Sequence, residues 1–178
     1  MTSQNTKGAF GIVKDARKRM RSFDDSLMIL VCTPTVEQGS IWQEYLDSSQ
    51  GVYHLRCQNC GELSIATNTL KHFQFECVLN DDDSKTYTEG SARIVCPACS
   101  HEHSSSDRER LIDQGGYIHK FPEKRSTKPG FQAGVLASKL SVFGWDQLAK
   151  IQLQCGRSAD LKDKMYFANS ILRTSICS

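Results

Sequence analysis

Residues 52–61 read VYHLRCQNCG and residues 92–100 read ARIVCPACS, and the rest of the chain is organised around these two stretches. Each is a run of strand-forming residues that ends in a C-x-x-C turn, and a small residue, Gly61 or Ser100, follows. Two such turns that face each other supply the tetrahedral four-thiolate set that structural Zn²⁺ prefers. A single C-x-x-C is compatible with a redox pair, but two in one domain favour metal. The predicted zinc ligands are Cys57, Cys60, Cys96 and Cys99.

The insert between the two turns is unusually long, because 35 residues separate Cys60 from Cys96, against roughly 15–20 in most paired C-x-x-C sites. We therefore expect an extra hairpin or loop there, with the acidic run at 80–84 (NDDDS) as its exposed tip. His101 and His103 follow the second turn, and either could replace a cysteine as ligand. Four thiolates are already present, so the all-cysteine set is the prediction.

The composition bounds the class of protein. Among the 178 residues, 22 basic and 20 acidic side chains leave a formal charge of +2, so DNA contact would need a local patch. The first ten residues are polar, and no apolar run approaches the ~18 residues of a membrane span. We expect a protein of a reducing compartment with no membrane segment, in which cysteines bind metal rather than form disulfides.

The N-terminal part supplies two candidate functional features. Residues 12–22 predict a helix that carries a cluster of basic residues, either a solvated face or a surface for phosphates; its members are Lys14, Arg17, Lys18, Arg19 and Arg21. The apolar run Leu27–Cys32 predicts a strand buried on both faces, as in a parallel α/β sheet. Thr33 and Thr35 then lie at its carboxyl end, where such sheets bind ligands.

One strand cannot form an α/β core, so residues 1–51 resemble the end of a larger domain. Residues 52–121 are predicted as a zinc-ribbon-like β module, and residues 122–178 as a helical connector with helices near 145–154 and 160–173. The predicted fold class is α+β. The sequence contains no G-x-x-x-x-G-K-[ST], no H-E-x-x-H, no G-x-S-x-G and no acidic two-metal cluster, so it predicts neither ATPase nor nuclease activity for this chain.

The order of these motifs resembles that of lambda-like, GpA-type phage terminase large subunits, the motors that package viral DNA. The resemblance runs from about residue 17 to residue 172. It rests on the strand with Thr33 and Thr35, Gly39-Ser40-Ile41, the two cysteine turns, Gly115-Gly116-Tyr117, Gly130-Phe131, Trp145-Asp146-Gln147-Leu148 and Phe167-Ala168-Asn169-Ser170-Ile171-Leu172. The chain departs mildly from the family pattern, with Gln58 in place of proline, Ser100 in place of glycine and Tyr117 in place of tryptophan.

The resemblance implies that the chain corresponds to the middle portion of such a subunit: the tail end of a P-loop-type α/β ATPase domain, the zinc module and the connector. It implies ATP and Mg²⁺ as cofactors of the intact protein only, with Thr33 and Thr35 in a coupling loop that senses the nucleotide. The implied partners are double-stranded DNA, the terminase small subunit and the portal or procapsid, in the cytoplasm of a bacterial host. The alternative is a stand-alone zinc-ribbon adaptor that binds nucleic acid or a partner protein through the basic helix.

Overall fold

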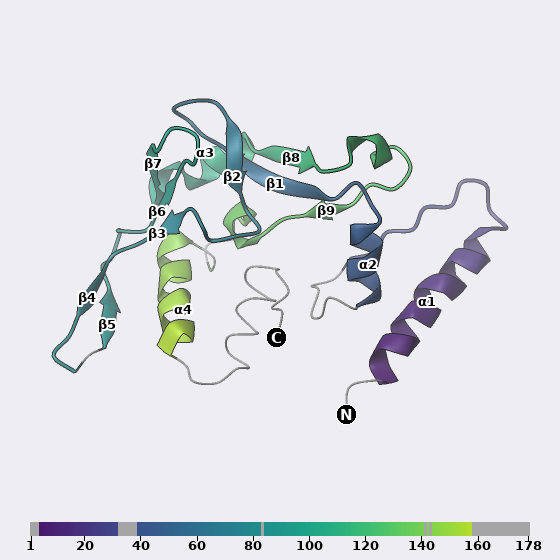
Figure 1. Ribbon diagram of the computed structural model, residues 1–178, viewed down its shortest axis with the longest axis horizontal. Helices are drawn as coiled ribbons and strands as arrows, with labels where there is room; N and C mark the ends of the chain where they lie inside the picture. Colours follow the sequence, from purple (N-terminus) through teal and green to yellow (C-terminus); the bar gives the residue numbers. More distant parts are fainter. Residues whose placement is uncertain (1–3, 32–38, 83, 141, 143, 158–178) are drawn as a thin grey trace.

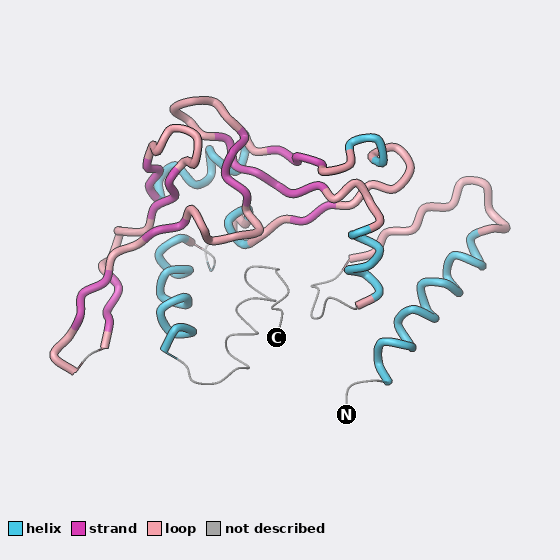
Figure 2. The backbone as a smooth tube through the Cα atoms, in the orientation of Figure 1, coloured by secondary structure: helices cyan, strands magenta, loops and turns pink. Residues whose placement is uncertain are grey.

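The computed structural model of the chain describes residues 4–31, 39–82, 84–140, 142 and 144–157. They form α-helices, short mostly antiparallel strands and short 3-10 turns, so the predicted α+β class is confirmed (Figure 1, Figure 2). Helices α1 (Gln4–Met20) and α2 (Ser40–Leu46) precede the first strand, and α4 (Trp145–Arg157) lies near the C-terminal end of the described part. No helix of the described part is long and apolar enough to cross a membrane.

Strand β1 (Gly51–Arg56) is the centre of the largest sheet. It pairs antiparallel with β2 (Leu63–Ala66) on one edge and with β8 (Gly116–His119) on the other. The short strand β9 (Phe131–Gln132) runs parallel to the first two residues of β1. The chain therefore returns three times to the strand that carries the first cysteine turn, which fixes the position of that turn.

A second sheet carries the second cysteine turn. Strand β6 (Arg93–Val95) lies between β3 (Phe73–Gln74) and β7 (Glu102–Ser104) and pairs antiparallel with both. Each C-x-x-C turn thus joins two antiparallel strands, β1 to β2 and β6 to β7. The residues that follow the turns, Gly61 and Ser100, have φ of 75° and 58°. Only glycine adopts this left-handed region without cost, so Ser100 pays a small strain to close its turn.

The long insert contains the predicted hairpin. Strands β4 (Cys77–Leu79) and β5 (Lys85–Tyr87) pair with each other and project away from the rest of the chain (Figure 1). The backbone N–H of Asn80 donates to the carbonyl of Ser84 over 2.8 Å and closes the acidic tip. Asn80, Asp81 and Asp82 are exposed, as the sequence predicts for a charged turn, and Ser84 is half-buried.

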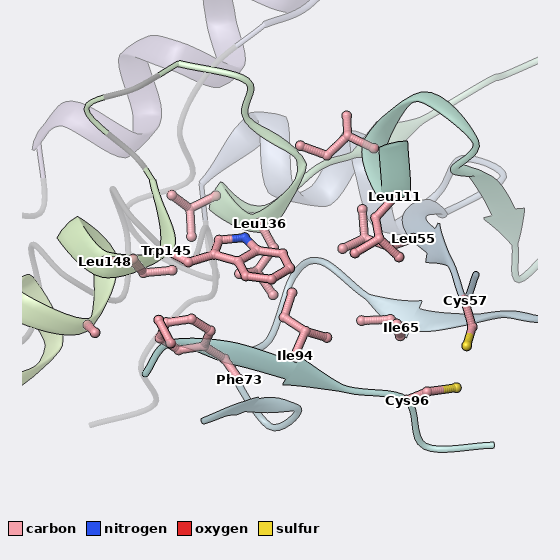
Figure 3. Packing of buried hydrophobic residues seen from close by; sticks show 14 of the residues in the cluster. Leu55, Cys57, Ile65, Phe73, Ile94, Cys96, Leu111, Leu136, Trp145 and Leu148 are labelled. Carbon is pink, nitrogen blue, oxygen red and sulfur yellow. The ribbon is translucent and has the colours of Figure 1, made fainter. Parts of the chain in front are cut away.

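The core joins both sheets to the C-terminal helix. Leu55 of β1, Ile65 of β2 and Ile94 of β6 have no exposed surface. Helices α3 (Arg108–Asp113) and α4 cover these three residues (Figure 3). The 3-10 turn η1 (Ser105–Asp107) directly precedes α3. The 3-10 turn η3 (Val135–Ala137) adds another buried leucine, while η2 (Pro122–Lys124) lies in the loop after β8. The covering side chains are Leu111, Leu136, Trp145 and Leu148.

The prediction of a buried strand at Leu27–Cys32 is wrong for the part that the structure describes. Residues 27–31 form neither helix nor strand, and Leu27, Ile29 and Val31 are 81%, 73% and 83% exposed. A strand exists only when a neighbour accepts and donates its backbone hydrogen bonds, and none of the described strands lies beside this run. The apolar side chains of this run favour burial, but the local sequence does not determine which other strand, if any, pairs with it.

Candidate metal centre

Four sulfur atoms converge where the two sheets meet. The Sγ atoms of Cys57, Cys60, Cys96 and Cys99 all lie within 4.8 Å of one another. Two cross-turn pairs are Cys57–Cys99, with Sγ atoms 3.7 Å apart, and Cys60–Cys96, with Sγ atoms 3.8 Å apart. A regular tetrahedron with Zn–S bonds of about 2.3 Å has sulfur–sulfur edges of about 3.8 Å. The four thiols therefore fit a tetrahedral Zn²⁺ with little rearrangement.

The two turns present their cysteines through the same backbone pattern. The N–H of Cys57 donates to the carbonyl of Glu62 over 2.9 Å, and the N–H of Cys96 donates to that of His101 over 2.9 Å. The N–H of the residue after each turn, Gly61 or Ser100, donates back to the first cysteine over 3.0 or 2.9 Å. This repetition makes the two turns near copies, and each directs two sulfurs into the space between them.

The four sulfurs differ in their environment. Cys57 and Cys96 are each 1% exposed, whereas Cys60 is exposed and Cys99 is half-buried. Figure 3 shows the sulfurs of Cys57 and Cys96 at the edge of the hydrophobic core. Side-chain donors reach three of the sulfurs: Ser64 Oγ at 3.3 Å from Cys96, Asn59 Nδ2 at 3.6 Å from Cys99, and His103 Nε2 at 3.3 Å from Cys57.

These different environments shift the pKa values of the Cys96 and Cys60 thiols in opposite directions. Burial raises the pKa of Cys96, but the Ser64 hydroxyl and the backbone N–H groups of Ala98 and Cys99 outweigh it and lower the pKa to about 6. A backbone N–H from Glu62 lowers the pKa of Cys60, but desolvation and the other cysteines outweigh it and raise the pKa to about 12. Four thiolates this close repel one another, and a divalent cation among them removes that repulsion.

Neither histidine belongs to the group of converging ligand atoms. His103 is 1% exposed and lies behind Cys57, while His101 is exposed and its ring contacts that of His103 edge-on, with centroids 4.7 Å apart. Burial and then the nearby His101 lower the pKa of His103. Among the described residues, the only set of metal-type ligands that converges is the four cysteines.

The remaining predicted site residues are the two threonines of the coupling loop and the basic cluster, and none of them belongs to the cysteine centre. Thr33 and Thr35 fall outside the described residues. The basic cluster lies on α1 and just after it, and all of its side chains are exposed; its members are Lys14, Arg17, Lys18, Arg19 and Arg21.

Two of these basic residues have acidic partners within the chain. Arg17 pairs with Glu44 of α2 at 2.5 Å, and Lys18 pairs with Asp15 at 3.4 Å. Glu44 also pairs with Lys128 at 2.9 Å. An open cleft of about 520 Å³ lies between α1 and α2, and Lys14, Arg17 and Glu44 contribute to its walls. The structure thus uses part of the basic cluster to hold α1 against α2.

Sequence patterns alone do not identify the side chains that donate to the sulfurs. Asn59 lies inside the first turn, so its contact with Cys99 depends on the second turn 40 positions away. Ser64 and His103 lie on β2 and β7, and each reaches a sulfur of the opposite turn. Side chains alternate between the two faces of a strand, and His103 is the buried residue of β7. All three residues of β7 are polar, so no sequence pattern marks His103 as the inward-facing one.

Comparison with known proteins gives one family. Residues 3–117 match the family described as phage terminase large subunit gpA, ATPase domain. The match covers both cysteine turns and all the strands from β1 to β7. No curated protein and no solved structure gives a significant match.

Proposed function

Because the chain belongs to the family of the phage terminase large subunit gpA, ATPase domain, we propose that it serves in viral DNA packaging as the zinc-stabilised part of a terminase large subunit. In this proposal the intact subunit hydrolyses ATP to move DNA into a procapsid and cleaves concatemeric DNA. The chain itself contributes a coupling segment and a rigid module. The observation that carries the proposal is the four-cysteine centre, since all of its ligands lie within the matched residues.

The donor set supports a structural rather than a catalytic metal. Catalytic zinc sites keep one coordination position open for water or substrate, whereas structural sites use four protein ligands. Here four thiols already complete a tetrahedron. Zn²⁺ bound by Cys57, Cys60, Cys96 and Cys99 would join the β1–β2 turn to the β6–β7 turn and act as a zinc-ribbon-like clamp between the two sheets.

The exposed apolar run at 27–31 supports the coupling role. Leu27, Ile29 and Val31 of this run are largely exposed. An exposed apolar patch of this kind is typical of an interaction surface. We infer that the ATP-binding part of the intact subunit covers this exposed apolar run. Thr33 and Thr35, which follow the run, would then form a coupling loop near the nucleotide.

The proposal gives the chain no catalytic activity of its own. The sequence lacks the glycine-rich loop and lysine that hold the phosphates of ATP. ATP, Mg²⁺, double-stranded DNA, the small subunit and the portal or procapsid are therefore assigned to the intact motor, in the cytoplasm of a bacterial host. The second candidate, a zinc-ribbon adaptor, is favoured by one observation, the exposed basic cluster on α1.

Metal analysis and an ATPase assay on one preparation test the proposal. We expect one zinc per chain in protein purified without chelator and no ATP hydrolysis, with or without duplex DNA. Protein without zinc, or hydrolysis that a substitution in this chain abolishes, contradicts it. The genomic neighbourhood separates the two candidates, because a reading frame with a P-loop immediately upstream, or a portal gene nearby, favours the terminase and an isolated gene favours the adaptor.

A further inference from the structure

The two buried sulfurs of the cysteine centre have a requirement that the two more exposed sulfurs do not share. A Zn²⁺ ion with four thiolates carries a net charge of −2, and that charge must be compensated by hydrogen-bond donors. Water can reach Cys60, which is exposed, and Cys99, which is half-buried. Water cannot reach Cys57 or Cys96, each 1% exposed, so only protein groups can donate to them.

Each buried sulfur has one side-chain donor at the same distance. His103 Nε2 lies 3.3 Å from Cys57 Sγ, and Ser64 Oγ lies 3.3 Å from Cys96 Sγ. The donors come from different sheets, Ser64 from β2 and His103 from β7. Each donor reaches a cysteine of the turn in the other sheet. The two hydrogen bonds therefore link the two sheets, as a metal ion bound by both turns would.

The surroundings of His103 fix which ring nitrogen carries the proton. Its Nδ1 is buried and has no hydrogen-bond partner among the described residues. A neutral imidazole has one N–H, and a proton on Nδ1 would bury a donor without an acceptor while leaving the Nε2 lone pair facing the sulfur. The proton therefore resides on Nε2 and points at Cys57. Strand pairing holds the ring there, since His103 lies directly opposite Ile94 of β6.

We propose that His103 and Ser64 are positioning residues of the metal centre, each of which donates a hydrogen bond to one buried thiolate. This inference rests on the proposed zinc site. The two bonds withdraw charge from the sulfurs, hold them at the ligand position and replace the water that burial excludes. Metal ligands usually depend on such outer contacts, whose removal weakens metal binding about 10–100-fold.

The experiment compares metal binding by four variants of the full chain with that of the wild type. His103→Phe removes the donor and keeps a ring of similar volume, whereas His103→Gln keeps an N–H at a similar reach. Ser64→Ala tests the second donor with the loss of a single oxygen. His101→Phe is the matched control. It makes the same substitution two residues away, at an exposed side chain with no hydrogen bond to a sulfur among the described residues, and its phenyl ring can keep the edge-on contact with the ring of His103.

Two readouts are measured for each protein. Competition with a chelating indicator gives the Zn²⁺ affinity, and titration with Co²⁺ gives the sulfur-to-cobalt charge-transfer band. We expect His103→Phe and Ser64→Ala to lose about 10–100-fold in affinity and to shift the band to lower energy, because a thiolate without a donor gives up its electrons more easily. His103→Gln is expected to recover most of both losses, and His101→Phe to match the wild type.

The possible results separate this inference from the proposal on which it rests. A wild-type chain that takes up no Co²⁺ or Zn²⁺ refutes the metal centre and the donors with it. A wild-type chain that binds metal, with His103→Phe and Ser64→Ala equal to it in affinity and band position, refutes only the donors. Equal losses in His101→Phe and His103→Phe also refute the donor role, since a general disturbance of the chain around β7 would then explain both. If His103→Phe does not fold, Ser64→Ala and His103→Gln decide the question.

Discussion

Replacement of Cys96 by serine tests how much of the stability of the fold comes from the metal centre. Cys96 is 1% exposed, directly follows β6 and has its sulfur 3.8 Å from that of Cys60. A serine oxygen sits closer to its own backbone than the sulfur does and stays protonated at neutral pH. Cys96→Ser therefore leaves three thiolates, and the link between the two sheets loses one of its two anchors on β6–β7.

The expected loss is comparable with the stability of a whole domain. Structural Zn²⁺ binding contributes about 10–16 kcal/mol in peptides that fold around it, whereas a typical domain is stable by about 5–15 kcal/mol. Leu55, Ile65 and Ile94 belong to one core that the two sheets share. Loss of the metal should therefore unfold both sheets together, and Cys96→Ser should show no cooperative thermal transition.

Cys77→Ser is the matched control. Cys77 is exposed on the projecting strand β4 and does not belong to the converging group, so its replacement should change stability by less than about 0.5 kcal/mol. Thermal unfolding is followed by circular dichroism, with and without chelator, alongside the zinc content. We expect chelator to abolish the transition in the wild type and in Cys77→Ser. A Cys96→Ser protein that keeps one zinc and melts within about 2 °C of the wild type, a shift of about 1 kcal/mol or less, would falsify the reasoning.

Three further predictions concern contacts away from the metal. Asp146→Ala removes the acceptor of three hydrogen bonds that join α4 to the β5 region and η1; we expect a loss of about 2–4 kcal/mol in urea unfolding, and an unchanged midpoint would contradict it. Burial raises the pKa of Glu44, but Lys128 and then Arg17 outweigh it and lower that pKa. Stability from this carboxylate is therefore present above its unfolded pKa of about 4.3 and is lost as the pH falls through the lower folded value. Lys128→Met should weaken this loss in acid titrations of stability, and an identical slope would count against the ion pair. Duplex DNA should bind weakly at low salt and much less at physiological salt, because each neutralised phosphate releases counterions; if Lys18→Glu with Arg19→Glu binds equally well at low salt, the basic cluster is only a solvated surface.

Several features of this protein follow from short stretches of sequence. A C-x-x-C turn needs only its own residues and the strand before it, so Cys57–Cys60 and Cys96–Cys99 could be identified without knowledge of the rest of the fold. The hairpin in the insert and its acidic tip are equally local, since the chain must turn where Asp81 and Asp82 cannot be buried. The order of these motifs also sufficed to suggest the terminase family, which the match over residues 3–117 confirms.

Other features depend on contacts between residues that are distant in sequence, and these contacts become visible only in the folded chain. The apolar pattern of residues 27–31 could not reveal whether a neighbouring strand exists, and Leu27, Ile29 and Val31 prove to be exposed. The contacts of Ser64 and His103 with sulfurs arise because two sheets meet across the cysteine turns. Local sequence fixes a turn through its own backbone geometry. A hydrogen bond between strands or sheets instead depends on how the whole chain packs, so its partner cannot be known until that packing is known.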